Sequence, residues 1–400
     1  MRKGWRTQKI GDVCQLMTGG TPSRGRPDYF GGKIKWLVSG DIHQKEIVDC
    51  EGRITEAGLK SSNTKLLPLN SVLIALNGQG KTRGTVALLR TRATCNQSLV
   101  SIYPHDPLTL LPEYLYANLH GRYQEIRRMT GDDGNDRRGL NMRLIKKIEI
   151  PIAPVSEQQR IVDILNKTFG GIAAAKANAE KNLKNARALF ESHLQSIFTQ
   201  GSAEWVGTTI GESIRFIDYR GKTPKKTNNG LRLITAKNVK MGYLKETPME
   251  FVAPESYDGW MTRGIPRRGD VLFTTEAPLA NVAQLDTDEK VVFAQRIIIM
   301  QADASKLDNT FLKYMLLSQA VQQRIRTKGT GATVQGIKAR LLKTIEISFP
   351  AALPLQREIA AKLDALREET RRLESIYTKN LEALEDLKRS LLNQAFSGEL

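Results

Sequence analysis

Residues 75–82 read ALNGQGKT, and their residue types come closer to a known chemical motif than any other stretch of the chain. They match a permissive form of the phosphate-binding P-loop, with Ala75 in place of the first glycine. In a P-loop a helix follows the lysine directly, so that its backbone N–H groups meet the phosphates. Here the sequence continues RGTVALLR, whose glycine, threonine and valine favour a strand. The pattern therefore predicts a hairpin tip that carries Lys81 and Arg83, with nucleotide binding left as a minor alternative.

Other constellations that could do chemistry are absent from the sequence. It holds no H-E-x-x-H, G-x-S-x-G or C-x-x-C motif, and its four histidines are scattered and suggest no acid–base pair. The three cysteines, Cys14, Cys50 and Cys95, are odd in number and widely spaced, which predicts buried, reduced thiols and no metal site. We therefore expect a chain with no catalytic residues, no metal and no cofactor of its own.

The positive charge is concentrated in two segments of the chain. Residues 1–150 carry 24 basic and 14 acidic side chains, and residues 201–347 carry 22 and 15. The segments after them are nearly balanced, with 6 basic and 4 acidic residues in 151–200 and 8 and 9 in 348–400. This distribution is typical of two modules that face a polyanion and are separated by spacers. The N-terminus lacks the apolar core of a signal peptide and no apolar run could span a membrane, so we expect a cytoplasmic protein.

The chain repeats itself at an interval of about 200 residues. RLIKKIEIPIAP, from Arg143, is matched by RLLKTIEISFPA, from Arg340, and WLVSGDI, from Trp36, by RLITAKNV, from Arg232. In each copy, short β-branched runs and glycine-rich turns are interrupted by one shorter helical stretch, at about 112–129 and 309–326. The pattern predicts two duplicated α+β domains.

A long helical pattern follows each domain, at about 157–198 and 356–396, beyond the length of ordinary globular helices. Alternate steps of four and three predict a heptad seam on each helix, which indicates that the two helices pair with each other. The seam positions are Ile161, Leu165, Ile172, Asn182 and Leu189 in the first helix, and Ile359, Leu363, Leu366, Leu373, Tyr377, Asn380, Leu384, Leu387 and Leu391 in the second. We expect Asn182 and Asn380, at matching steps, to lie in or near the seam and fix its register.

In this order, the motifs resemble the specificity subunits of type I restriction-modification systems. The stretches that carry the resemblance are GGTPS at Gly19, WLVSGDI at Trp36, YRGKTP at Tyr219, GDVLF at Gly269 and the two helix entries that follow I-E-I. The resemblance covers the whole chain, although the first copy has NSVLIA where the family commonly has GDVL.

The resemblance implies a fold with internal pseudo-twofold symmetry. Two target-recognition domains, residues 1–152 and 201–349, would be separated by two spacer helices, residues 153–200 and 350–400, that pair as an antiparallel coiled coil. Each domain would read one half of a bipartite, asymmetric site on double-stranded DNA. The helices would set the spacing and dock two modification (methyltransferase) subunits, which a restriction (endonuclease and translocase) subunit can join. S-adenosylmethionine, ATP and Mg2+ would be bound by those partners.

Base reading and phosphate contacts are expected from polar and basic loop side chains. In the first domain the candidates are Thr21, Ser23, Arg24, Arg26, Gln79, Lys81, Arg83, Arg137 and Arg138. In the second they are Arg220, Lys222, Lys225, Lys226, Lys328, Thr330, Thr333 and Gln335. The alternative function is a scaffold that grips nucleic acid or other acidic partners without sequence preference.

Overall fold

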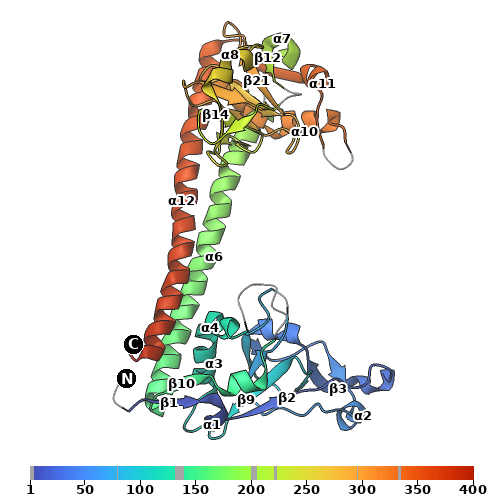
Figure 1. Cartoon of the computed structure of the whole chain (residues 1–400), viewed down its shortest axis with the longest axis vertical. Helices are drawn as coiled ribbons and strands as arrows, with labels where there is room; N and C mark the ends of the chain where they lie inside the picture. Colours follow the sequence, from blue (N-terminus) through green and yellow to red (C-terminus); the bar gives the residue numbers. More distant parts are fainter. Residues whose placement is uncertain are drawn as a thin grey trace. The chain divides into compact units, whose positions relative to one another are not determined.

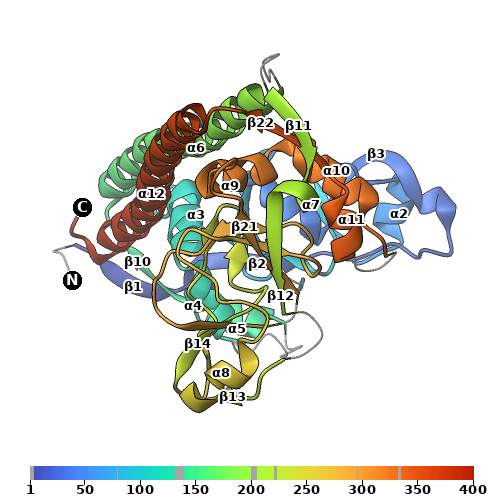
Figure 2. The same cartoon turned by 90° about the horizontal axis from the view of Figure 1, so that it is seen from above.

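The computed structural model describes residues 4–78, 80–130, 139–199, 205–219, 223–294, 296–331 and 335–400. Contacts group the chain into two units, residues 1–179 with 379–400, and residues 180–378. Each unit holds one α+β domain and parts of both long helices, α6 (Val155–Thr199) and α12 (Leu353–Ser397). Within each unit the two helices run side by side (Figures 1 and 2). The division into four segments stays a prediction, because each long helix belongs in part to both units.

The first unit is built on a five-stranded sheet. Its strands, in spatial order, are β2 (Cys14–Thr18), β9 (Leu99–Pro104), β6 (Val72–Ala75), β7 (Val86–Leu89) and β4 (Glu46–Ile47). A second sheet holds β5 (Arg53–Ile54), β3 (Phe30–Leu37) and β8 (Thr94–Cys95), and β1 (Arg6–Lys9) pairs with β10 (Glu149–Ile152). The helices are α1 (Ile10–Val13), α2 (Glu56–Lys60), α3 (Pro112–Gly121), α4 (Tyr123–Arg128) and α5 (Met142–Lys146), with 3-10 turns η1 (Pro27–Tyr29) and η2 (Ser39–Gln44).

The second unit repeats this plan. Its main sheet holds β12 (Ile214–Asp218), β21 (Ile297–Ala302), β18 (Val271–Thr274) and β19 (Val282–Gln284). The smaller sheets are β13 (Lys226–Thr227), β17 (Glu250–Val252), β14 (Leu231–Ile234) and β20 (Val291–Phe293), then β11 (Trp205–Thr209) with β22 (Glu346–Pro350), and β15 (Val239–Lys240) with β16 (Tyr243–Leu244). The helices are α7 (Ile210–Ser213), α8 (Tyr257–Trp260), α9 (Asn309–Leu317), α10 (Gln319–Lys328) and α11 (Ala339–Lys343), with η3 (Pro254–Ser256).

The two duplicated α+β domains predicted from the sequence are confirmed. The central strands are apolar on both faces because each separates two cores. In β6, Val72 and Ile74 belong to the core that includes α3, whereas Leu73 belongs to the core beneath the smaller sheet. In β18, Val271 and Leu272 divide between two cores in the same way. The apolar stretch VVFAQRIIIM, from Val291, holds two strands that belong to different sheets, β20 and β21.

A buried glutamine ties the start of each long helix to its domain. Gln158 donates to the carbonyls of Thr109 and Ala153 and accepts from the N–H of Leu111. Gln356 makes the same three bonds, to Lys306, Pro350 and Asp308. Both side chains are fully buried. The repeat thus keeps a polar anchor where a helix leaves its domain.

The helices are antiparallel where they pair within each unit. In the first unit Lys176 of α6 is 2.6 Å from Glu385 of α12, and Phe169 lies beneath Lys388. In the second, Arg187 contacts Glu374 at 3.5 Å, and Phe190 lies beneath Arg367. In both units the positions on α12 fall as those on α6 rise. Among the described helices, none combines the length and apolarity needed to cross a bilayer.

Four predicted seam positions are wrong. Leu189 is 59% exposed, Leu387 is 47% exposed, and Asn182 and Asn380 are also exposed. The inward positions lie one residue later: Phe190 is buried and Lys388 is half-buried. The spacing becomes eleven residues from Ala179 to Phe190 and from Leu384 to Ala395, which matches a straight helix of about 3.6 residues per turn better than a heptad does. The two asparagines therefore do not fix a seam register.

The other predicted seam positions are buried or partly buried, and their place in the seam stays a prediction. Ile161, Leu165 and Leu363 are buried. Partly buried positions are Ile172, Ile359, Leu366, Leu373, Tyr377, Leu384 and Leu391. The cysteines are also as expected: all three are free and buried, and burial raises the pKa of Cys14 to about 12.

Candidate nucleic-acid interface

One edge of the main sheet gathers several loops in the first unit. The end of β2 adjoins the start of β9, and the start of β9 adjoins the end of β6, because both pairs are antiparallel. The loop after β2 and the β6–β7 hairpin therefore emerge at the same edge. Thr21 Oγ1 donates to Gln97 Oε1 at 2.6 Å, and His43 Nε2 lies 3.1 Å from Thr82 Oγ1. Loop residues from distant parts of the sequence thus meet there, and one of them is the candidate Thr21.

The glycines of GGTPS are explained by a close approach of two backbones at this edge. A Cβ on Gly19 would lie 1.8 Å from the carbonyl oxygen of Cys95. The next N–H, of Gly20, donates to that same carbonyl, and its own carbonyl accepts from the indole of Trp36. Any side chain at Gly19 would push the loop off the sheet, so the motif positions the residues that follow it.

The second unit forms the same edge with different side chains. The ends of β12 and β18 adjoin the start of β21. A short loop runs back along β18, since Ile337 N–H donates to Thr275 and a β-bridge joins Glu276 to Gly336. Thr330 is bridged to Gly336 on this loop. Thr330 and Gln335, both exposed, therefore lie at the edge that corresponds to Thr21 and Lys81.

Some candidates are engaged elsewhere. Arg26 forms an ion pair with Asp28 at 2.9 Å and lowers the pKa of that carboxyl, mainly through this hydrogen bond. Lys226 is in β13 and pairs with Glu250 at 2.8 Å. Lys328 donates to the carbonyl and hydroxyl of Thr344, each at 2.8 Å. These cations would have to leave an existing partner to contact a phosphate.

The remaining candidates fall into two groups. Ser23, Arg24, Lys81 and Lys225 are exposed in loops, and Arg83 is half-buried in the hairpin. Gln79, Arg137, Arg138, Arg220, Lys222 and Thr333 lie outside the described residues. Their roles stay predictions.

The sequence interpretation overlooked two residues at these edges, Gln97 and Arg296. Gln97 precedes β9 and holds Thr21, while Arg296 precedes β21 and pairs with Glu276 at 2.9 Å. They occupy similar places, one strand start in each repeat. The sequence signal that could have found them is the polar stretch just before each apolar strand, NQS in the first copy and QR in the second.

The hairpin that carries ALNGQGKT is not a P-loop. Strand β7 follows it at Val86, so no helix N-terminus is available to phosphate. The N–H of Gly84 donates to Ala75. The carbonyls of Gly80 and Lys81 accept from Arg127 and Tyr123, at 2.6 and 3.0 Å. The tip is thus fastened to α4, and the nucleotide-binding alternative loses its basis.

Two α+β modules that each present a polar and basic loop edge, joined by paired helices, define a class of duplicated binding proteins. The described residues hold no group of three or more His, Cys, Asp or Glu side chains that could bind a metal ion. The profile of the type I restriction modification DNA specificity domain matches residues 2–185 and 262–383. The chain therefore belongs to the family of type I restriction-modification DNA specificity proteins.

Individual relatives agree with this assignment. The chain is 30% identical over 165 residues to the type I restriction enzyme EcoR124I/EcoR124II specificity subunit of Escherichia coli, a stretch that covers 41% of this chain and 40% of the relative. It is 22% identical to the MjaVIII specificity subunit of Methanocaldococcus jannaschii over 99% of this chain and 93% of the relative. A solved structure described as the basis of complex assembly and conformational transition of the type I R-M system shares the fold. Its TM-score is 0.78 with 18% identity, over 100% of this chain and 99% of that one.

Proposed function

We propose that this chain gives a type I restriction-modification complex its DNA sequence specificity. Each α+β domain reads one half of a split, asymmetric site in double-stranded DNA. The observation that carries the proposal is the paired construction of the loop edges. Each unit places loops from three places in the sequence at one edge of its main sheet, and the two edges carry different side chains. Two domains of similar fold that present different side chains to DNA suit a site whose two halves differ in sequence.

The proposal assigns the chemistry to other subunits. The paired helices dock two modification subunits, which bind S-adenosylmethionine, and restriction subunits supply the ATP- and Mg2+-dependent nuclease. Because the chain contains two similar halves, two identical partners can bind one asymmetric subunit. Purified chain with S-adenosylmethionine and target DNA should transfer no methyl groups, and methylation should appear when modification subunits are added.

Exchange of one domain tests the modular reading. Residues 1–150 are replaced by the equivalent part of a relative, and the chimera is expressed with its modification subunits. Methylome sequencing should show one half of the methylated motif changed and the other half retained. The reciprocal chimera, with residues 201–347 exchanged, is the matched control and should change the other half. A change in both halves from a single exchange would contradict the proposal.

A scaffold without sequence preference is the second function to test. Both functions predict DNA binding that weakens with salt, because basic loops displace counterions from the phosphates. Only a specificity subunit prefers a particular duplex. Gel shifts of the complex with modification subunits, on the methylated motif and on a scrambled duplex of equal length, separate the two. Equal affinities at every salt concentration would favour the scaffold.

The helices are proposed to set the gap between the half-sites. Insertion of four residues at matching points of α6 and α12 adds about 6 Å at 1.5 Å per residue and nearly completes a turn. The half-sites should keep their sequences while the unread gap grows by one or two base pairs. An insertion of two residues turns the apolar faces by about half a revolution and should abolish activity. An unchanged gap in an active four-residue variant would show that the helices are not the spacer.

A further inference from the structure

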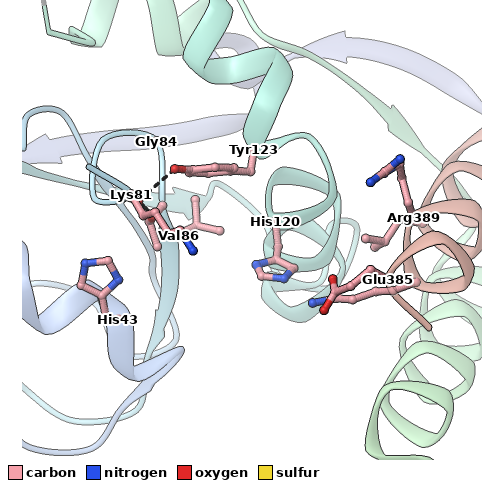
Figure 3. Close-up of a pocket in the computed structure, with 11 residues that line it drawn as sticks. His43, Lys81, Gly84, Val86, His120, Tyr123, Glu385 and Arg389 are labelled. Atoms are coloured by element: carbon pink, nitrogen blue, oxygen red, sulfur yellow. Dashed lines mark hydrogen bonds between the residues drawn. The ribbon is translucent and has the colours of Figure 1, made fainter. Parts of the chain in front are cut away.

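A pocket of about 360 Å³ lies in the first unit between the β6–β7 hairpin, α3, α4 and α12 (Figure 3). Its walls combine apolar and aromatic groups with cations. Val86, Tyr123 and Leu392 form the apolar part, and Lys81, Lys388 and Arg389 bring positive charge. The volume is within the range of small-molecule sites, about 300 to 1,000 Å³.

The hairpin wall of this pocket is firmly held. Tyr123 Oη donates to the carbonyl of Lys81 at 3.0 Å, which Figure 3 marks as a dashed line. Arg127 donates to the hairpin at Gly80 and to Tyr123 itself, at 2.6 and 2.8 Å. The hairpin and α4 are therefore fixed to each other, so an occupant would meet a preformed wall on this side of the pocket.

The charges around the pocket are poorly balanced. Its carboxylate, Glu385, is already paired with Lys176 at 2.6 Å. Arg389 lies 3.4 Å from Asp386, but both side chains are mostly exposed. Burial, followed by the charge of Lys45, lowers the pKa of Lys388. Cations crowded at a partly desolvated site repel one another, and an anion between them would relieve that repulsion.

The second unit has a pocket at the equivalent place, and its chemistry differs. Leu392 and His120 correspond to Leu194 and Leu317, which line that second pocket. Where the first unit has Lys388 and Arg389, the second has Phe190 and Glu191. The other walls of the second pocket are mainly amides, Gln195, Gln319, Gln322 and Gln323, with Arg326 as a cation beside Glu191. A partner that binds both halves alike would need similar sites, so the cationic pocket serves a ligand of the first unit alone.

We propose that the pocket bounded by Lys81, Lys388 and Arg389 binds a phosphate-bearing ligand of about mononucleotide size. Guanidinium and ammonium groups together are the usual recognition elements for phosphate oxygens. The rings of Tyr123 and His120 provide flat surfaces for the rest of the ligand. The site uses side-chain cations, so it is unrelated to a P-loop. The phosphate could belong to a free metabolite or to DNA beyond the recognised bases.

Calorimetry on the full chain tests the proposal with pyrophosphate and AMP as probes. The pocket variant is Lys388→Gln with Arg389→Gln. The control, Lys379→Gln with Arg372→Gln, removes the same charge from exposed positions of the same helix. The native chain should bind, the pocket variant should bind at least about tenfold more weakly, and the control should match the native chain. Absence of binding by the native chain, or equal losses in both variants, would overturn the proposal.

A second readout is the titration of His120, followed by NMR on the full chain. His120 has its pKa lowered to about 4 by burial and by Lys388 and Lys45, with Glu385 the acidic group in the same pocket. An anion bound beside it should raise that pKa, and saturating pyrophosphate should therefore shift its titration to higher pH. His105 and His193 are internal controls, because neither lines this pocket, whereas His43 does. An unmoved His120 titration at saturation would place the bound probe elsewhere and overturn the assignment.

Duplexes distinguish the two sources of phosphate. If the ligand is a free metabolite, AMP and DNA should bind together without competition. If it is a DNA phosphate, a long duplex should displace pyrophosphate while a duplex confined to the recognised motif should not. Either result supports the pocket as a phosphate site. The calorimetry and the His120 titration do not depend on sequence specificity, so failure of the pocket and failure of the specificity proposal are distinguishable.

Discussion

Each unit has a joint, the region where its α+β domain packs against the two long helices. The two joints carry opposite residue types, a cation or an aromatic ring, at equivalent positions. In the first unit Lys388 of α12 lies 5.3 Å above the ring of Phe169 of α6. In the second, the equivalent of Lys388 is Phe190 and the equivalent of Phe169 is Arg367, whose guanidinium lies 4.8 Å above the Phe190 ring. Cation and ring have exchanged places. Phe190 also packs against Tyr314. The first unit has Ala117 at the position of Tyr314, and there the cationic pocket is present.

Other features are shared by the joints. Tyr114 packs edge-on against Phe396 at 5.4 Å, and Phe311 packs against Phe198 at 5.3 Å. The two buried glutamines are also equivalent. Duplication therefore kept the glutamines at the helix starts and the aromatic contacts at the helix ends, while the positions around Lys388 and Phe190 diverged. Two domains with similar folds can therefore carry different binding sites, because folding requires only the contacts that hold the helices to each domain.

The largest expected effect is at Phe190. Truncation of this buried ring, Phe190→Ala, should lower the free energy of unfolding by about 3–5 kcal/mol. The equivalent change Lys388→Ala should cost less than about 1 kcal/mol, because a half-buried lysine at a cavity leaves little new void. Urea unfolding of the full chain measures both. Similar decreases in the free energy of unfolding for the Phe190 and Lys388 variants would contradict the proposed difference between the two joints.

The glutamine anchors should behave alike. Gln158→Leu and Gln356→Leu each leave a buried N–H and buried carbonyls without their partner, which costs about 2–3 kcal/mol. Hydrogen exchange would locate the loosening at the start of α6 or α12. Gln159→Leu is the control: Gln159 is exposed and bonds to Asp163 of its own helix, and the change should alter stability by less than about 0.5 kcal/mol. Clearly unequal losses at Gln158 and Gln356 would show that the anchor is not preserved.

A smaller, pH-dependent effect is expected at His120. Its pKa is lowered from 6.5 to about 4, so the unfolded chain binds more protons than the folded chain between these values. The free energy of unfolding therefore falls as the pH drops from 6.5 towards 4. Replacement by the residue of the second unit, His120→Leu, should remove a loss of about 2 kcal/mol over that range. Thermal unfolding at pH 8 and pH 4.5 measures the difference, and parallel pH curves for both proteins would refute it.

The smallest effect is expected at the exposed ion pair of the first unit. Lys176→Gln, which breaks the pair with Glu385, should cost about 0–0.5 kcal/mol. In the second unit Lys313 is largely buried and lies 2.9 Å from Asp364, which also accepts from Tyr314 at 2.5 Å. Lys313→Gln should therefore cost more than Lys176→Gln. High salt should erase the effect of the Lys176 change, and salt-independent losses would contradict this view of the exposed pair.

The internal repeat was sufficient to predict the domain organisation from the sequence. Matching stretches such as RLIKKIEI and RLLKTIEI, and two helical patterns of unusual length, were sufficient for two α+β domains and two paired helices. These features depend on local periodicity, which residue order alone encodes. The antiparallel run of the helices was expected only from the resemblance to specificity subunits, and the contacts within each unit confirm it.

Side-chain placement at the seam and at the loops was decided by tertiary packing. Extending a strict heptad put Asn182, Leu189, Asn380 and Leu387 inward, yet all four are exposed, because the helices pass to an eleven-residue spacing. Gln97 and Arg296 reach the loop edges only because antiparallel pairing brings strand starts beside strand ends. The pocket at Lys388 joins residues some 300 positions apart. Local sequence patterns do not predict such long-range contacts, since these contacts depend on how separately formed elements pack.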